Sequence, residues 1–177
     1  SANNYQPEPH RARMAASYYF SRYPHVWGWA TWRRAWQHFD ASLSAWQSAP
    51  ERDAILRRFE HPRERAFWRW AWDGVTAGRI DSWAYGWSFA CLTHDGLSVT
   101  PGQNLVDNIG CGPDATHTQT AASCRPEYPA GPIAFPLVHP ADYDRDRRAD
   151  RHTAGMMNMQ PALWQRVLGK LKRTLKA

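Results

Sequence analysis

Residues 17–36, SYYFSRYPHVWGWATWRRAW, join a strand pattern to a helix start and set the expected fold class. The aromatic run at 17–23 favours a strand, and Pro24 ends it. The small residues Gly28 and Ala30 follow, and the segment from Trp32 predicts a helix that runs to about Asp40. A strand and a helix so close together indicate a chain that mixes both elements.

The same signals continue along the chain. Helices are expected at 50–59, 62–77 and 83–93, where Pro, acidic residues or Ser mark the starts and Gly marks an end. Short strands or extended segments are expected at 97–100 and 104–107, and loops at 1–16 and 109–136. A charged helix is predicted from Pro140 to about His152, and a last one from Pro161. We therefore predict a helix-rich α+β chain.

Composition narrows the class of protein. The chain has 177 residues, 43% hydrophobic and 21% charged, which suits one ordinary domain or part of a larger one. It has no apolar run long enough for a membrane span, and the N-terminal residues do not have the pattern of a signal peptide. Three widely spaced cysteines (Cys91, Cys111 and Cys124) do not form a disulfide framework and favour a reducing cytosol.

The net charge of +6 is concentrated at one end of the chain. Six of the 22 basic residues lie at 151–177, which has no Asp or Glu, so the rest carries 16 basic and 16 acidic residues. Nucleic-acid binding needs a basic groove on the folded body and is therefore disfavoured. The segment 161–177 combines an apolar stripe with five basic residues. This pattern predicts either a helix docked on the protein or one lying on an anionic membrane surface.

Eleven tryptophans are many for this length. They indicate either a large aromatic core or sugar recognition, since indole faces stack on pyranose rings. Hydrolase and nucleotide-binding signatures are absent from the sequence. A zinc site built from Cys91, His94, Cys111 and His117 is an alternative, but buried or incidental thiols are the simpler interpretation.

Three motifs carry a family resemblance: WGWATW at 27–32, IDSWAYGW at 80–87 and NLVDNIGCGPDATHT at 104–118. They resemble the C-terminal half of bacterial family-2-like glycosyltransferases of the GT-A fold, including the haemolytic protein (HlpA-like) group. The resemblance covers about residues 3–139. It implies that residues 1–140 form the acceptor-side part of a glycosyltransferase domain and that 141–177 add a charged helix and a basic helix. The nucleotide-binding half of that family has no counterpart in this sequence.

The resemblance implies a set of substrate-binding residues near the first two motifs. The wall of the pocket would be formed by aromatic side chains, and the small residues Gly28 and Ala30 would let a sugar approach the backbone. An arginine there would hold phosphate or carboxylate. A tightly packed junction with two solvated arginines is the alternative. The remaining residues in this set are Trp27, Trp29, Trp32, Arg33, Arg34, Trp83 and Tyr85.

Glycosyl transfer needs a base for the acceptor hydroxyl. Many relatives have Asp where this chain has Ala84, so Asp81 is the candidate base, with helix capping as its alternative role. The resemblance also implies that His117 ligates a divalent cation, Mn²⁺ or Mg²⁺, together with carboxylates of the missing half. Asn108 and Asp114 would order this loop or contact the ligand.

We therefore expect part of a cytoplasmic glycosyltransferase that moves a sugar from a nucleotide-sugar donor to a cell-surface glycan or lipid-linked glycan. Residues 161–177 would hold it at the inner face of the cell membrane. The isolated chain would be inactive. A non-catalytic carbohydrate-binding or scaffold fragment is the alternative.

Overall fold

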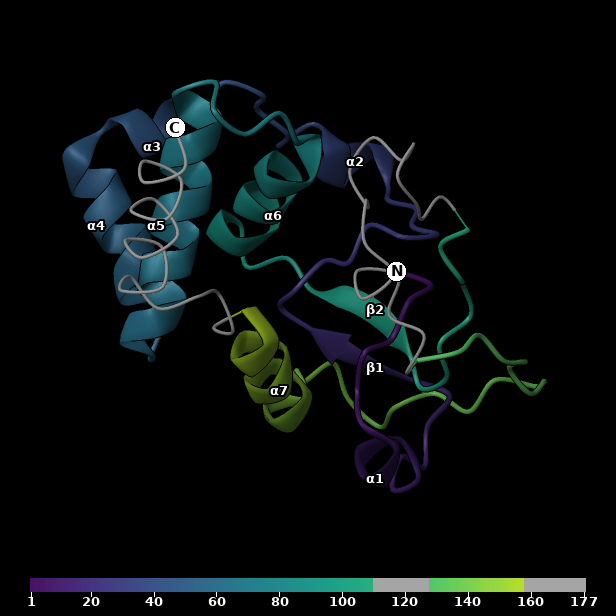
Figure 1. The fold of residues 1–177 in the computed structure, drawn as a ribbon. Coiled ribbons are helices and arrows are strands. Elements are labelled where there is room, and N and C mark those ends of the chain that lie inside the picture. Colours follow the sequence, from purple (N-terminus) through teal and green to yellow (C-terminus); the bar gives the residue numbers. More distant parts are fainter. Residues whose placement is uncertain (110–127, 158–177) are drawn as a thin grey trace, which may run out of the picture.

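A computed structural model describes residues 1–109 and 128–157. This part of the chain is helix-rich with a small sheet, in agreement with the predicted α+β class. In Figure 1, α3, α4 and α5 form one group, α6 lies between this group and α2, and the sheet lies near α7 and α1. The elements in chain order are α1 (Glu8–Arg11), β1 (Tyr18–Ser21), α2 (Arg33–Trp36), α3 (Ser44–Gln47), α4 (Ala49–Arg57), α5 (Pro62–Thr76), α6 (Trp83–Thr93), β2 (Ser98–Pro101) and α7 (Arg147–Met157).

The sheet contains two antiparallel strands in the described residues. β1 and β2 pair along their whole length, from Tyr18 opposite Pro101 to Ser21 opposite Ser98. These strands confirm the predictions at 17–23 and 97–100. The segment 104–107, predicted as a strand or an extended segment, forms no strand and runs beside the N-terminal residues, where the Leu105 N–H donates to the Ala2 carbonyl over 2.9 Å.

The N-terminal residues, predicted as a loop, are held firmly against the sheet. The buried Asn4 amide donates to the carbonyls of Pro101 and Gly102 over 2.7 and 2.9 Å, and its backbone N–H donates to Asn104 Oδ1 over 3.0 Å. Each bond spans almost a hundred residues of sequence, so segments 1–6 and 101–105 form one unit. The sequence analysis missed the short helix α1 that follows.

Several helix boundaries agree closely with the sequence. α5 begins at Pro62, as predicted, and Gly78 adopts the left-handed conformation (φ +65°) just after its end. α6 spans the predicted residues, but Ser82 at its N-cap position makes no capping side-chain hydrogen bond. α2 is shorter than expected. The Asp40 carboxylate beyond it accepts the backbone N–H groups of Ser42 and Ser44, which turns the chain into α3, a helix that the sequence analysis missed.

The predicted start of the helix at Pro140 is wrong. α7 begins seven residues later, at Arg147, because the Asp146 carboxylate accepts the backbone N–H groups of Arg148 and Ala149 over 2.9 and 2.8 Å. This is the role of an N-cap residue. α7 packs against α5 and β1, where buried Asp150 accepts a hydrogen bond from Ser21 Oγ over 2.7 Å. It therefore belongs to the same packed body as the preceding elements.

Aromatic side chains dominate the core, so part of the tryptophan content is structural. The Trp72 ring lies 4.9 Å from the ring centroids of both Trp46 and Trp68. Trp46 Nε1 donates to the Asp73 carboxylate over 2.9 Å, which satisfies a buried polar group. The core residues are Tyr23, Leu43, Trp46, Ile55, Leu56, Phe59, Trp68, Trp72, Phe89, Leu92 and Ala154.

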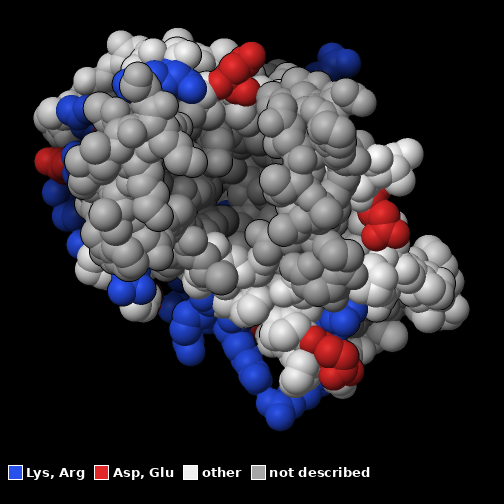
Figure 2. Space-filling view, in the orientation of Figure 1, with Lys and Arg blue, Asp and Glu red and all other residues white. Residues whose placement is uncertain are grey.

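Basic side chains in the described part lie mainly along the left and lower rim of the view in Figure 2, where Figure 1 shows α4, α5 and α7. None of the helices in residues 1–109 and 128–157 has the length and apolar character needed to cross a membrane. The predicted basic helix at 161–177 lies outside the described residues.

Candidate functional site

Four tryptophans from three segments form the tryptophan cluster: Trp29, Trp36, Trp83 and Trp87. The Trp29 ring lies 5.0 Å from Trp83, 5.6 Å from Trp87 and 5.7 Å from Trp36, measured between centroids. Trp83 and Trp87 are one helical turn apart, so α6 presents both to the loop that carries Trp29. Trp36 and Trp83 remain 40% and 46% exposed. The cluster fixes α2 and the preceding loop against α6.

A cavity of about 340 Å³ opens next to this cluster, and we call it the Trp29 cavity. α6 contributes Trp87, Ala90 and Cys91 to its wall, and His94, the residue that caps the C-terminus of α6, adds to the same side. The spacing i, i+3, i+4, i+7 places these residues on one face of the helix. The loop before α2 and α2 itself supply the opposite wall, which includes Trp29, Trp32 and Arg34.

The polar groups of the Trp29 cavity come from arginine and histidine. The Arg34 guanidinium lies 5.2 Å from the Trp32 ring centroid, a cation–π distance. The His38 and His94 rings stack with centroids 4.0 Å apart. His94 Nδ1 lies 3.0 Å from the Ala90 carbonyl and 3.1 Å from Thr93 Oγ1, and in the tautomer with the proton on Nδ1 the other ring nitrogen, Nε2, is an acceptor. Burial raises the pKa of the Cys91 thiol to about 12, which keeps this thiol protonated and unreactive.

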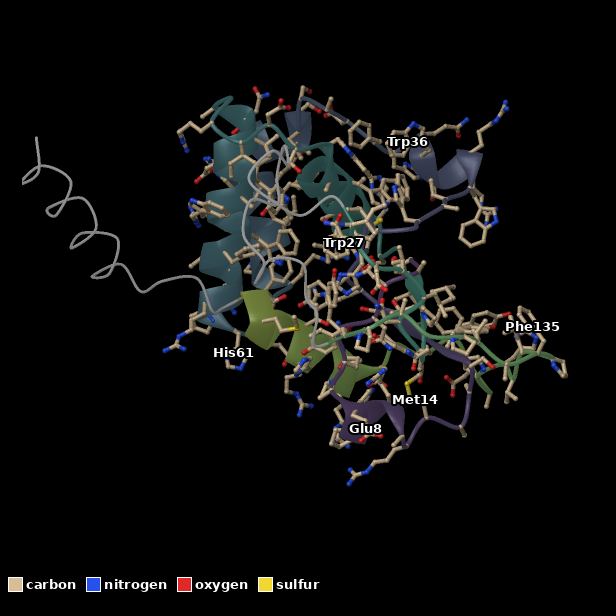
Figure 3. The ribbon with its side chains drawn as sticks, turned by 45° about the vertical axis from the view of Figure 1, so that its right-hand side comes forward. Glu8, Met14, Trp27, Trp36, His61 and Phe135 are labelled. Carbon is tan, nitrogen blue, oxygen red and sulfur yellow. The ribbon has the colours of Figure 1, made fainter. Side chains whose placement is uncertain are left out.

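A second cavity of about 340 Å³ lies across the loop at Pro24 and His25, two residues that line both cavities. We call it the Trp27 cavity. α6 lines it with a different face, through Ala84, Tyr85 and Ser88. Its other aromatic lining residues are Tyr5, Trp27, Phe67 and Trp68, and Asn3 also lines it. In Figure 3, Trp36 at the end of α2 lies in the upper part of the view, and Trp27 lies near the centre of the molecule.

Burial keeps the polar groups of the Trp27 cavity uncharged. Burial lowers the pKa of His25 to about 4, so this ring is neutral at pH 7. Burial also raises the pKa of Tyr85, which retains its phenolic proton. The Tyr5 ring contacts His25 edge-on at 5.4 Å and Trp27 at 5.9 Å, and it holds both rings in place. The described lining of this cavity is therefore aromatic and neutral.

The structure divides the predicted substrate-binding residues between the two cavities. Trp29, Ala30, Trp32 and Arg34 line the Trp29 cavity, whereas Trp27 and Tyr85 line the Trp27 cavity. Four residues of the predicted set line neither cavity: Gly28, Arg33, Trp83 and Asn108. Two predicted site residues, Asp114 and His117, lie outside the described residues.

Gly28 has a structural reason to be glycine. Its backbone adopts φ +55°, and a Cβ there would lie 2.7 Å from the Ala2 side chain. The close approach that this position allows is therefore to the N-terminal segment of the same chain.

Asp81, the candidate base, is exposed and lines neither cavity. Helix α6 begins at Trp83, so Ser82 and not Asp81 occupies the N-cap position. Ala84, which replaces the aspartate of many relatives, lines the Trp27 cavity. A carboxylate at position 84 would therefore belong to the wall of that cavity.

Sequence reasoning missed several lining residues. The i+4 and i+7 relations of Trp87, Cys91 and His94 would have revealed their shared face on the predicted helix at 83–93. Asn3 and Trp68 carry no comparable signal, because only the tertiary fold brings them together. In the described residues, no group of three or more His, Cys, Asp or Glu side chains is arranged to hold a metal ion. The cation predicted at His117 stays a prediction.

Comparison of the chain with models of protein families, with curated proteins and with solved structures found no match in any of the three.

Proposed function

We propose that this chain is the acceptor-side part of a nucleotide-sugar glycosyltransferase of the GT-A fold, acting on a cell-surface or lipid-linked glycan. One observation carries the proposal: the Trp29 cavity combines the indole rings of Trp29, Trp32 and Trp87 with the guanidinium of Arg34. Aromatic faces with a few placed polar groups are typical of sugar sites.

Each side chain of this cavity has a defined role in the proposal. Trp29 and Trp32 stack on the C–H faces of sugar rings and hold the acceptor in place. Arg34 binds a carboxylate or phosphate of the acceptor through paired hydrogen bonds. Nε2 of His94 accepts a hydrogen bond from a sugar hydroxyl. Together these groups favour an acidic or phosphorylated glycan.

Catalysis in this proposal needs a nucleotide-binding half in addition to these residues. The paired strands β1 and β2 support such a half, because a two-stranded sheet is only marginally stable alone and gains from further strands. Asp81 would act as base for an acceptor hydroxyl held near the exposed Trp83 ring. A divalent cation at His117, when bound, would stabilise the charge of the departing diphosphate. The chain would work in the cytoplasm at the inner face of the membrane.

A second candidate function is a non-catalytic carbohydrate-binding or scaffold module. The position of Asp81 outside both cavities and the presence of Ala84 in the Trp27 cavity favour it. The glycosyltransferase and the carbohydrate-binding module both predict sugar binding by this chain, whereas a scaffold does not. They differ in whether the protein translated from the complete reading frame transfers sugar from a nucleotide donor.

The sugar-binding part is tested on the chain itself. We expect methyl β-glucuronide to give saturation-transfer NMR signals at low salt. It should bind to the Trp29 cavity more tightly than methyl β-glucoside, which competes for the same cavity. Trp32→Ala and Arg34→Gln should each weaken glucuronide binding several-fold. Both parent side chains are exposed, so these changes should leave the fold intact. Trp70→Ala is the matched control, because Trp70 is 38% exposed and lines neither cavity. Equal binding by all three variants would contradict the proposed site.

A further inference from the structure

A third cavity, of about 260 Å³, lies where several segments of the chain meet, and we call it the arginine cavity. Three arginines line it: Arg22 follows β1, Arg58 follows α4, and Arg145 precedes α7. The rest of its wall comes from the end of α6 and the turn after it, through Cys91, Leu92, Asp95, Gly96 and Leu97. The lining therefore has three guanidinium groups and one carboxylate.

The guanidinium of Arg22 has no acceptor in the described part of the protein. Only its backbone N–H has a polar partner in residues 1–109 and 128–157, the carboxylate of Asp150 at 3.3 Å. Its Cζ lies 4.7 Å from the ring centroid of Phe59 and 5.7 Å from that of Tyr23. A cation–π contact uses none of the five N–H donors. Because Arg22 lines the cavity and is only half-buried, a ligand there can bond to these donors.

Arg58, in contrast, is fully engaged by the protein. It donates to the carbonyls of Leu92 and Thr93 over 2.6 and 3.0 Å, and it forms an ion pair with Asp95. The single carboxylate in the lining is therefore already paired. Arg58 fixes the end of α6 against α4 and leaves the binding of a ligand to the other two arginines.

Arg145 shares one buried carboxylate with Arg22. An isolated parallel bridge between Phe20 and Arg145 brings Arg145 beside β1, and in Figure 1 the helix α7 that follows lies between α5 and the sheet. Its Nη1 lies 3.3 Å from Asp150 Oδ2, whereas Asp150 Oδ1 accepts from Ser21 Oγ and from the Arg22 N–H. One carboxylate thus faces two guanidinium groups, which leaves one positive charge without a counter-charge.

The neighbouring side chains do not cancel this charge. A smaller cavity of about 90 Å³ shares Arg22 and Arg145 with the arginine cavity. The other charged side chains of its lining, apart from Asp150, are two arginines and two glutamates, Arg147, Arg151, Glu60 and Glu64. These four balance one another, so the excess positive charge remains with Arg22 and Arg145.

The free donors and the excess charge favour a phosphate group. Guanidinium groups bind oxyanions through paired N–H···O bonds. A phosphate has enough oxygens for Arg22 and Arg145 together, whereas one bidentate arginine already occupies both oxygens of a carboxylate. The buried Phe59 ring beside Arg22 keeps water from that side and strengthens the attraction. The volume of about 260 Å³ is below the usual range for small-molecule sites, so it suits a phosphate group better than a whole nucleotide.

We infer that the arginine cavity is an anion site that binds a phosphate group, with Arg22 as its main donor and Arg145 as the second. The site adjoins the Trp29 cavity at Cys91, Gly96 and Leu97, but Arg34 does not line it. It does not depend on sugar binding or sugar transfer. The phosphate belongs either to a soluble ester or to a lipid headgroup, and the experiment distinguishes these sources.

The test titrates the full chain with inorganic phosphate and glycerol 3-phosphate at constant ionic strength, followed by ³¹P NMR and by the melting temperature. Both ligands should bind saturably and raise the melting temperature. Arg22→Gln should weaken binding at least tenfold and abolish the rise. Arg22→Lys keeps the charge but loses the paired donors, so it should weaken binding several-fold, and it replaces Arg22→Gln if that variant does not fold. Arg69→Gln is the matched control, because it removes the same charge from an exposed side chain outside the cavity.

Vesicles distinguish the two sources of phosphate. A lipid headgroup predicts that the wild type prefers phosphatidic acid to phosphatidylserine at equal surface charge, and that Arg22→Gln loses this preference. A soluble ester predicts binding of glycerol 3-phosphate without that preference. The inference is overturned if a folded Arg22→Gln variant matches Arg69→Gln with both the esters and the vesicles. Loss of phosphate binding in Arg34→Gln but not in Arg22→Gln would also overturn it, because the anion would then lie in the Trp29 cavity.

Discussion

Lowering the pH should unfold this protein partly through one residue, His25. This half-buried ring lies between the two cavities, and burial, together with the positive charge of the Ser1 N-terminus, lowers its pKa from 6.5 to about 4. Below pH 6.5 the unfolded chain binds a proton that the folded chain does not take up until about pH 4. The stability that neutral His25 contributes is therefore complete above pH 6.5 and is lost as the pH falls towards 4.

The size of the effect follows from the two pKa values. At pH 5 the difference in proton binding removes about 2 kcal/mol from the free energy of unfolding, and at pH 4 about 3 kcal/mol. His25→Gln keeps a polar side chain of similar length but has no group that titrates in this range. The variant should lose about 2 kcal/mol less than the wild type between pH 7 and pH 5.

Urea denaturation followed by tryptophan fluorescence at both pH values measures these losses. His61→Gln is the control, because His61 is exposed on the connection between α4 and α5, and it should behave as the wild type. Other titrating groups affect all three proteins equally and cancel in the comparison. If His25→Gln and the wild type lose the same free energy between pH 7 and pH 5, the environment assigned to His25 is wrong.

Three further predictions concern packing, the metal and the basic tail. Gly74→Ala should lower the free energy of unfolding by about 1–2 kcal/mol in urea, because its Cβ would clash with the side chain of Ile80. Gly155→Ala in α7 meets no atom within 4 Å and should stabilise by about 0.5–1 kcal/mol, and equal effects would contradict the packing. In the protein from the complete reading frame, His117→Ala should weaken the dependence of turnover on Mn²⁺ or Mg²⁺, and unchanged dependence would leave His117 a structural residue. The chain should sediment with anionic vesicles at low salt through 161–177, since each Lys or Arg near the surface contributes about 1 kcal/mol. Replacing three lysines with Gln (Lys170, Lys172 and Lys176) should remove most of that binding without lowering the melting temperature. Equal binding to neutral and anionic vesicles would refute the membrane role.

The sequence alone was sufficient to predict a helix boundary where the residue at that boundary has one dominant conformational effect. Pro62 and Gly78 bracket α5 because proline fits a first turn and glycine accepts the left-handed conformation. The start of α7 was missed because Pro140 offers the same signal without a helix. The residue that sets the start of α7 is the N-cap Asp146. It is one of three aspartates in residues 140–146, and only the folded backbone shows which of them accepts the N–H groups of the first helical turn.

Some residues that line the Trp29 cavity could be named from the sequence, but the arrangement of the two cavities could not, and the substrate-binding role of these residues stays a prediction. The WGWATW motif indicated an aromatic wall, and its residues Trp29 and Trp32 line one cavity together with Arg34, which follows the motif. Trp27 and Trp29 look equivalent in sequence, yet they line different cavities, because the chain turns at Gly28 with a positive φ. The contributions of Asn3 and Trp68 depend on contacts between segments far apart in sequence, and no local pattern encodes these contacts.

Sugar transfer by the protein translated from the complete reading frame tests the central claim most directly. The protein would be incubated with nucleotide sugars, Mn²⁺ and a glucuronide-terminated acceptor, and both the released nucleoside diphosphate and the extended glycan would be measured. We predict acceptor-dependent release in the wild type, a several-fold higher KM for the acceptor in Trp32→Ala and Arg34→Gln, and unchanged kinetics in Trp70→Ala. Glycan binding without any transfer would contradict the glycosyltransferase assignment and leave a carbohydrate-binding module.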